Sequence, residues 1–232
     1  MTTILGIDAA WTSGQPSGVA LVSSTASSWR LIFAGSSCGH RLDRGKGDRI
    51  PGSRPLGAVA EAAAHVVVAE EIAESPVNLV AVDMLLSLVP ITARRVSDNL
   101  ISAAFGARHC SSHTPSAIRP GKIIDDLRGG FERCGYRQLT KEVAVPYLLE
   151  IYPHPSLVEL MSAEKRLPCK QGKVRNCWPS ETPAGRGIEL FETWLAIIHG
   201  LEQEIAGVSE ISILPSPWIP QSGFLSSRRD RP

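Results

Sequence analysis

The sequence predicts an α/β fold built on one mixed β-sheet, and two observations carry this prediction. Three β-patterned segments, 3–8, 18–23 and 29–34, follow one another with only short turns between them. Two continuous apolar segments, 77–83 and 146–152, come later, each after a helical pattern, which is typical of buried parallel strands. Because short turns join antiparallel strands and helical crossovers join parallel ones, we expect an antiparallel three-strand meander followed by two parallel strands.

Helical patterns surround the later strands, at 57–74, 92–105, 121–134, 155–162 and 186–206. The alanine-rich first helix has the broad apolar surface of a helix that packs on a sheet. The second is amphipathic, with an apolar stripe formed by Ala93, Val96, Leu100, Ile101 and Ala104. The order of elements is that of the ribonuclease H-like three-layer α/β/α arrangement, a core that sugar kinases and actin-like ATPases share. We expect this domain to span 1–206 and the proline- and serine-rich segment 207–232 to form a poorly ordered tail.

Composition is that of an ordinary globular protein. The 232 residues are 43% apolar and carry a net charge of +1, so the overall charge argues neither for nor against a nucleic-acid partner. The five cysteines are scattered without a C-x-x-C pair, which is typical of reduced thiols in a cytoplasm; zinc binding through Cys169 and Cys177 is the alternative. No signal peptide precedes the first strand and no apolar run is long enough for a membrane span, so we expect a cytoplasmic protein without a membrane partner.

Two acids end the strands that we place side by side at the centre of the sheet. Asp8 ends the first strand and Asp83 ends the fourth. Carboxylates that meet at one sheet edge repel each other unless a cation lies between them, and oxygen ligands favour Mg²⁺ or Mn²⁺. We therefore expect Asp8 and Asp83 to be catalytic residues and metal ligands; the alternative is that each acid only caps its strand.

A third acid, Glu150, lies near the end of the fifth strand and is followed closely by His154. A charge within a central apolar strand is costly unless it is paired or liganded. Glu150 is therefore the third predicted catalytic residue and metal ligand, with an ion pair to Arg94 or Arg95 as the alternative. His154 is a predicted substrate contact or proton shuttle, or else it caps the helix that follows.

Basic residues suited to phosphate binding occur in two places. Arg94 and Arg95 open the helix after the fourth strand, and Lys170 and Lys173 lie in a basic segment close to Trp178. Guanidinium forks fit phosphates, and cations beside an aromatic ring suit a nucleic-acid backbone with a stacked base. We predict that the four basic residues bind substrate; a solvated first turn and a charged loop anchored by Trp178 are the alternatives.

The chain resembles the bacterial and archaeal family known as domain of unknown function 429. The resemblance rests on an ordered set of motifs over about residues 3–205, namely GIDAAW, PSGVALV, LVAVDMLLS, ARRVSDNLISAAFG, SSHTPS, LLEIYPHPSLVEL and RLPCKQGKVRNCWP. It implies a ribonuclease H-like fold and the nuclease activity with which that family is often labelled, a label that rests on fold and acid placement. The matching positions it implies are Asp8, Asp83, Arg95, Asp98, Glu150, His154, Lys170 and Lys173.

The chain departs from that family at its end. Members usually finish with a helix bearing a D-x-x-D-A-like motif, which supplies the last metal ligand in ribonuclease H-like nucleases. Here SPWIPQSGFLSSRRDRP takes that place, and Asp230 is the one acid after Glu210. We hypothesise a truncated or frame-shifted C-terminus that leaves the metal site incomplete. DNA past the stop codon that encodes no such helix in any frame would contradict this hypothesis.

Three functions stay open at this point. The first is a Mg²⁺- or Mn²⁺-dependent nuclease that acts on nucleic acid through the acids and basic residues above. The second is a nucleotide- or phosphate-binding protein in which the turn at 12–18 wraps a phosphate through backbone N–H groups. The third is a non-catalytic scaffold that keeps the fold. Self-association is open for each of them.

Overall fold

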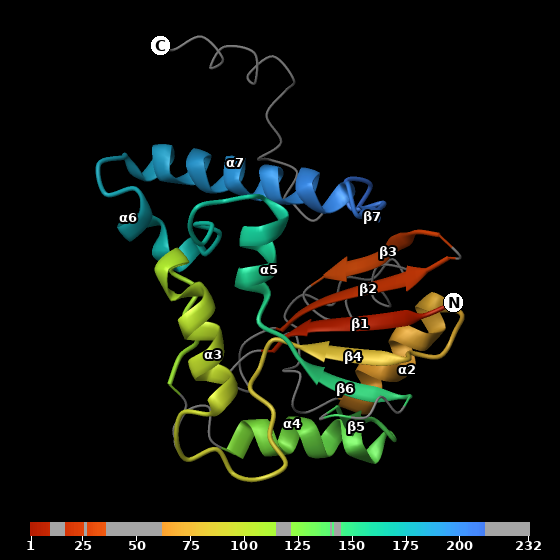
Figure 1. Cartoon of the computed structure of the whole chain (residues 1–232). Helices are drawn as coiled ribbons and strands as arrows, with labels where there is room; N and C mark the ends of the chain where they lie inside the picture. The colour runs from red at the N-terminus through yellow and green to blue at the C-terminus, as the bar shows by residue number, and fades with distance from the viewer. Residues whose placement is uncertain are drawn as a thin grey trace, which may run out of the picture.

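The structure is a computed structural model that describes residues 1–9, 17–25, 27–35, 62–114, 122–139, 141 and 145–211. These residues form an α/β fold around one mixed sheet, and the sheet has seven strands in the order β5-β6-β4-β1-β2-β3-β7 (Figure 1). The predicted fold class is therefore confirmed at the level of a single mixed α/β sheet.

The predicted strands are all present. The antiparallel meander consists of β1 (Thr3–Asp8), β2 (Gly18–Ser24) and β3 (Trp29–Gly35), and β4 (Leu79–Val82) and β6 (Tyr147–Glu150) run parallel to β1. Two very short strands that the sequence did not predict, β5 (Arg137–Gln138) and β7 (Ile205–Ala206), add a parallel pair at each edge. Two-residue strands carry too little pattern to be recognised from sequence.

The register of the central strands brings the acidic positions to one edge of the sheet. Ile7 pairs with Val82, and Val82 pairs with Glu150 on its other side. The Asp83 backbone N–H continues this ladder and donates to the Ile7 carbonyl at 2.8 Å. The carboxyl ends of β1, β4 and β6 are thus level, and α3 and α5 lie beyond them (Figure 1).

The helices follow the predicted order with shifted ends. They are α2 (Ala62–Ala73), α3 (Val96–Phe105), α4 (Lys122–Arg133), α5 (Pro153–Leu160), α6 (Val174–Cys177) and α7 (Pro183–Glu202). Helix α5 begins at Pro153, two residues before the predicted start at Pro155. Both prolines lie in its first turn, where a missing N–H costs nothing. The segment 164–185, expected as a loop, contains α6 and a 3₁₀ turn at Gln171–Lys173.

One face of the sheet is covered by α2 and α4, and this is where the core lies. Ile7 of β1 belongs to a buried cluster with Leu127 and Phe131 of α4. Helix α2 contacts β1, β2 and β3 and packs against α4. A Cβ atom placed on Gly130 would lie 2.9 Å from the Cβ of Ala62, so the close crossing of these helices needs glycine at that position.

Helix α3 is held in a way that its sequence pattern did not predict. Val96 and Leu100 of the apolar stripe are 75% and 65% exposed, and the one buried residue of the helix is Asp98. Much of the apolar stripe that the pattern predicts is therefore exposed. Polar contacts of Arg94, Arg95 and Asp98 anchor the first turn instead, which periodicity alone does not reveal.

The described helices and cysteines bear on the predictions about membrane spans and disulfides. Within the described part of the chain, no helix combines the length and the apolarity that a bilayer crossing requires. Cys110, Cys134, Cys169 and Cys177 are free thiols, as the scattered spacing predicts.

Candidate functional site

Asp8 and Asp83 lie next to each other at the carboxyl ends of the paired strands β1 and β4. Asp8 is exposed and Asp83 is half-buried. Neither carboxylate forms a hydrogen bond or an ion pair within the described ranges. A half-buried carboxylate without any partner is costly, because burial removes water that nothing replaces. This pair is where an added cation would be most stabilising.

The electrostatics of Asp83 reflect this position. Burial, reinforced by the negative charge of Asp8, raises the pKa of Asp83 to about 6, while the positive charges of Lys170 and Arg166 act in the opposite direction. The negative charge of Glu150 also raises the pKa of Asp83, by a smaller amount, so Glu150 lies near enough to belong to the same site. With this pKa, Asp83 is mostly ionised at neutral pH, at the cost of its burial and of repulsion from Asp8.

Glu150 has a different environment from the two aspartates. Its carboxylate accepts two hydrogen bonds from the Arg95 guanidinium, at 2.7 Å and 2.6 Å, and a third from the Leu86 backbone N–H at 2.8 Å. The alternative of an ion pair with Arg95 is thus the arrangement found. The bidentate pair ties the loop before α3 to the end of β6. The role of Glu150 as a metal ligand stays a prediction.

Arg95 uses all of its side-chain donors within the chain. An arginine has five N–H donors. In Arg95 they reach both oxygens of Glu150, both oxygens of Asp98 and the Leu86 carbonyl, at 2.6–3.1 Å. Asp98 in turn accepts from the Arg95 backbone N–H, so the two residues form a capping box for α3. No donor of Arg95 is left for a phosphate, and its predicted substrate contact stays untested.

The charges of this network stabilise one another. The hydrogen bond to Glu150 raises the pKa of Arg95 above its ordinary value. Burial would raise the pKa of Asp98, but the hydrogen bonds from Arg95 outweigh it and hold that pKa below the usual range. Both side chains therefore stay charged in the folded protein.

Arg94 contacts the backbone of Asp98 and also the segment that contains Ser112 and Thr114. Its guanidinium donates to Asn99 at 2.7 Å, to the Asp98 carbonyl at 2.9 Å and to Thr114 at 3.0 Å. It also contacts Ser102 and Ser112. Its observed contacts all lie within its own chain, and its predicted role in substrate binding stays a prediction.

His154 is buried, at 6% exposed, in the first turn of α5. Burial, together with the charges of Arg166, Lys170 and His113, lowers the pKa of His154 to about 4, so the ring is neutral at physiological pH. An Nη2 donor of Arg166 lies 2.5 Å from His154 Nε2. Because arginine only donates, this nitrogen is the acceptor. Tyr152 packs edge-on against the imidazole with a centroid distance of 5.4 Å.

Arg166 is a site residue that sequence reasoning missed. It opens the basic RLPCKQGK motif, in which the sequence predicted Lys170 and Lys173 as the substrate-binding residues. Lys170 of the same motif is exposed, and its charge acts on both Asp83 and His154. Lys173 is exposed, and its side chain has no hydrogen bond or ion pair with the described residues. The signal that could have indicated Arg166 as a site residue is its position shortly after the helix that carries His154.

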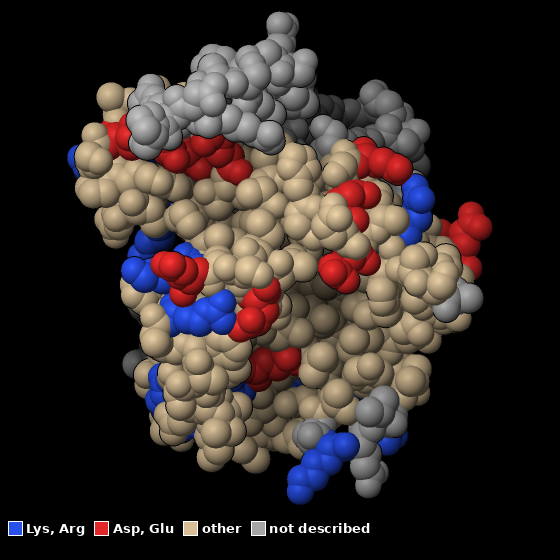
Figure 2. Space-filling model, turned by 45° about the horizontal axis from the view of Figure 1, so that its top comes forward, with Lys and Arg blue, Asp and Glu red and all other residues tan. Residues whose placement is uncertain are grey.

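Other predicted sites are less well supported. Among the residues that the structure describes, no group of three or more His, Cys, Asp or Glu side chains is arranged to hold a metal ion, which also covers Cys169 and Cys177. Most of the turn at 12–18 lies outside the described residues, so the phosphate-wrapping hypothesis has no structural description. Acidic and basic side chains are interspersed on the face shown in Figure 2, and acidic atoms also lie at the floor of a hollow.

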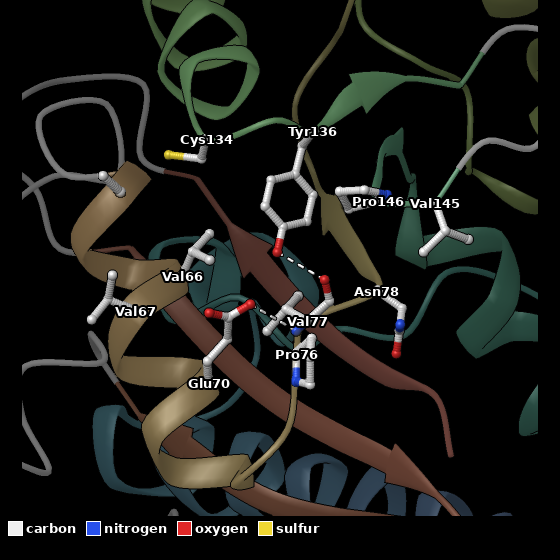
Figure 3. Close-up of a pocket in the computed structure, with 11 residues that line it drawn as sticks. Val66, Val67, Glu70, Pro76, Val77, Asn78, Cys134, Tyr136, Val145 and Pro146 are labelled. Atoms are coloured by element: carbon white, nitrogen blue, oxygen red, sulfur yellow. Dashed lines mark hydrogen bonds between the residues drawn. The ribbon is translucent and has the colours of Figure 1, made fainter.

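A separate cavity of about 440 Å³ lies at the opposite end of the strands. It is lined mainly by apolar side chains of α2 and of the segments around Val77 and Pro146 (Figure 3). Its polar groups are already engaged: Glu70 accepts from the Val77 N–H at 3.1 Å, and the Tyr136 hydroxyl donates to the Val77 carbonyl at 2.8 Å. Because its lining is mainly apolar and these polar groups are hydrogen-bonded within the protein, we interpret the cavity as a feature of packing and not as a ligand site.

The Tyr136 hydroxyl offers a modest test of this packing. Replacing Tyr136 by phenylalanine leaves the buried Val77 carbonyl without its side-chain donor. We expect a loss of about 1 kcal/mol in the free energy of unfolding. Urea titration of both proteins measures the difference, and equal midpoints would show that the hydrogen bond contributes nothing.

Comparison of the chain with family models, curated proteins and solved structures finds no match.

Proposed function

We propose that the protein is a metal-dependent phosphodiesterase of the ribonuclease H-like type that acts on nucleic acid. The observation that carries the proposal is the Asp8–Asp83 pair, two adjacent carboxylates without hydrogen-bond partners at the carboxyl ends of the central parallel strands. Clefts at the carboxyl ends of strands are the usual position of sites in α/β sheets. The strand order β6-β4-β1-β2-β3, with an antiparallel meander, supports the ribonuclease H-like type.

The donor set fits Mg²⁺ or Mn²⁺. Magnesium is commonly held by one or two carboxylates and completes its shell with waters and substrate phosphates. Asp8 and Asp83 would supply those carboxylates, and Lys170 and Arg166 would hold a phosphate beside them. When bound, the ion would polarise the phosphodiester and activate water. Glu150, held by Arg95, would keep the loop after β4 in position.

Calorimetric titration with Mn²⁺ tests the proposal directly. We expect the unmodified protein to bind Mn²⁺ and the Asp8→Asn variant to lose at least about tenfold in affinity, because one charged ligand is gone. Asp126→Asn is the matched control, since Asp126 is an acid of α4 whose one ion-pair partner in the described part of the chain is Lys122. A phosphodiesterase assay on single-stranded and duplex RNA and DNA follows with the same variants.

A second function, a non-catalytic binding protein, is favoured by one observation. The third acid, Glu150, is engaged by Arg95 and the Leu86 N–H rather than facing the aspartates freely. No Mn²⁺ binding at millimolar metal would contradict the phosphodiesterase proposal and favour this second function. Binding that Asp8→Asn leaves unchanged would place the metal elsewhere and would also contradict the proposal.

A further inference from the structure

Arg166 is a half-buried arginine without an acidic partner. No carboxylate oxygen of the described residues lies within 4.0 Å of its guanidinium, and its one side-chain hydrogen bond is to neutral His154. Arg95 and Arg128 are also half-buried, but Arg95 is paired with two carboxylates and Arg128 with Glu132. Arg94, which likewise has no carboxylate partner among the described residues, is instead held by several neutral acceptors, whereas Arg166 has one neutral acceptor, His154. An uncompensated charge in a partly buried position is costly unless an anion joins it.

A second cation lies on the same side of the site. Lys170 is exposed and forms no ion pair with the described residues, and its charge reaches Asp83 and His154, as the charge of Arg166 does. Among the described residues, the site therefore has two cations without an ion pair beside two carboxylates without one, and no salt bridge joins the two sets. The two cations would bind an anionic ligand, and the two carboxylates would bind the cation that accompanies it.

We propose that Arg166 and Lys170 form a phosphate-binding subsite beside the Asp8–Asp83 pair, and that His154 is the positioning residue that holds the Arg166 guanidinium toward it. The two positive charges match a dianionic phosphate monoester, the group found at the end of a nucleic-acid chain or on a nucleotide. The inference deepens the proposed function, on which it rests for the part that this phosphate plays in a reaction. Binding of the phosphate itself does not depend on the metal.

The role of His154 follows from its protonation state. A neutral Nε2 can accept from Arg166, whereas a protonated ring would repel the guanidinium. His154 is fixed by burial in the first turn of α5 and by the edge-on ring of Tyr152. It therefore restrains one Nη2 hydrogen of Arg166 and leaves the remaining donors for the oxygens of a ligand.

Titration with inorganic phosphate in the presence of EDTA tests this subsite without any metal. We expect the unmodified protein to bind phosphate at millimolar concentrations and Arg166→Gln to weaken binding by about ten- to a hundredfold, as is usual when a charged hydrogen-bond donor is removed. Arg175→Gln is the control, because Arg175 is an exposed arginine of the neighbouring helix α6, and it should bind as the unmodified protein does. Absence of phosphate binding by the unmodified protein, or equal affinity in Arg166→Gln, would overturn the proposal.

The positioning role has its own readout. We expect His154→Leu to weaken phosphate binding and His154→Gln, which keeps an acceptor, to restore most of it. In the Arg166→Gln background the His154→Leu change should have no further effect, since residues that act through one contact are not additive. Additive effects would contradict the role of His154.

Mn²⁺ binding separates this inference from the proposed function. Arg166→Gln should still bind Mn²⁺, because it leaves both carboxylates in place, and this binding also shows that the variant is folded. Phosphate binding that depends on Arg166 in a protein that binds no Mn²⁺ would uphold the subsite and contradict the phosphodiesterase. Mn²⁺ binding without phosphate binding would contradict the subsite alone.

Discussion

Replacing Arg95 by methionine is expected to lower the free energy of unfolding by about 3–5 kcal/mol, the usual cost of removing one partner from a buried ion pair. Arg95 is the shared donor for Asp98, which is 2% exposed, and for Glu150 at the end of β6. Without it, one buried and one half-buried carboxylate lose their cation, and the capping box of α3 is lost as well. Because α3 fully buries no apolar side chain, its first turn depends on these ion pairs together with the hydrogen bonds of Arg94.

Chemical denaturation of the two proteins measures this difference, and Arg128→Met is the matched control. The Arg95 and Arg128 side chains are both 19% exposed, but those of Glu132 and Asp125, which face Arg128, are 38% and 46% exposed, whereas that of Asp98 is 3% exposed. We expect the control to lose less than about 1 kcal/mol, as exposed ion pairs do. Equal losses in the two variants would show that Arg95 contributes only its aliphatic packing.

The Asp83→Asn variant is expected to be more stable than the unmodified protein while it loses metal binding. Burial and the neighbouring Asp8 raise the pKa of Asp83 to about 6, so the ionised carboxylate destabilises the folded state at neutral pH. Removing that charge should stabilise the metal-free protein by about 1–2 kcal/mol once partial exposure is allowed for. A residue whose replacement improves stability at the expense of binding is typical of a functional site.

The sign of the pH dependence gives a sharper test. The folded protein holds the Asp83 proton more tightly than the unfolded chain does, because the pKa is raised from 3.8 to about 6 on folding. The ionised carboxylate therefore lowers the free energy of unfolding by its full amount above about pH 6, and this loss disappears as the pH falls toward 3.8. The stability difference between Asp83→Asn and the unmodified protein should therefore be largest at about pH 8 and vanish near about pH 4. Denaturation midpoints at several pH values measure it, with Asp126→Asn as the control. A difference that grows toward acid pH would contradict the prediction.

Much of the framework was predictable from residue patterns. The meander at 3–34, the buried strand that ends before Asp83 and the strand that ends at Glu150 were recognised from short-range alternation and apolar runs. Since the topology of such elements follows from their connections, the adjacency of Asp8 and Asp83 could be predicted as well. The roles of these acids in metal binding and catalysis stay predictions.

Side-chain partners were not predictable in the same way. That Glu150 pairs with Arg95, and that Arg166 contacts His154, depends on contacts between segments far apart in the chain. The exposed stripe of α3 is a similar case, because the pattern shows that a helix has an apolar side but not whether anything covers it.

The sequence by itself determined the five longer strands and the acids at the ends of the central ones, because hydrophobic alternation and chain connectivity are local properties of the chain. The tertiary structure alone decided which charges are paired. Glu150 is neutralised and Asp83 is not, although both lie at the ends of central strands. The loop before α3 brings Arg95 to Glu150, whereas no basic side chain of the described residues lies within bonding distance of Asp83. Whether two charges pair depends on a distance of a few ångströms between segments that are far apart in the sequence, and local sequence patterns do not reveal that distance.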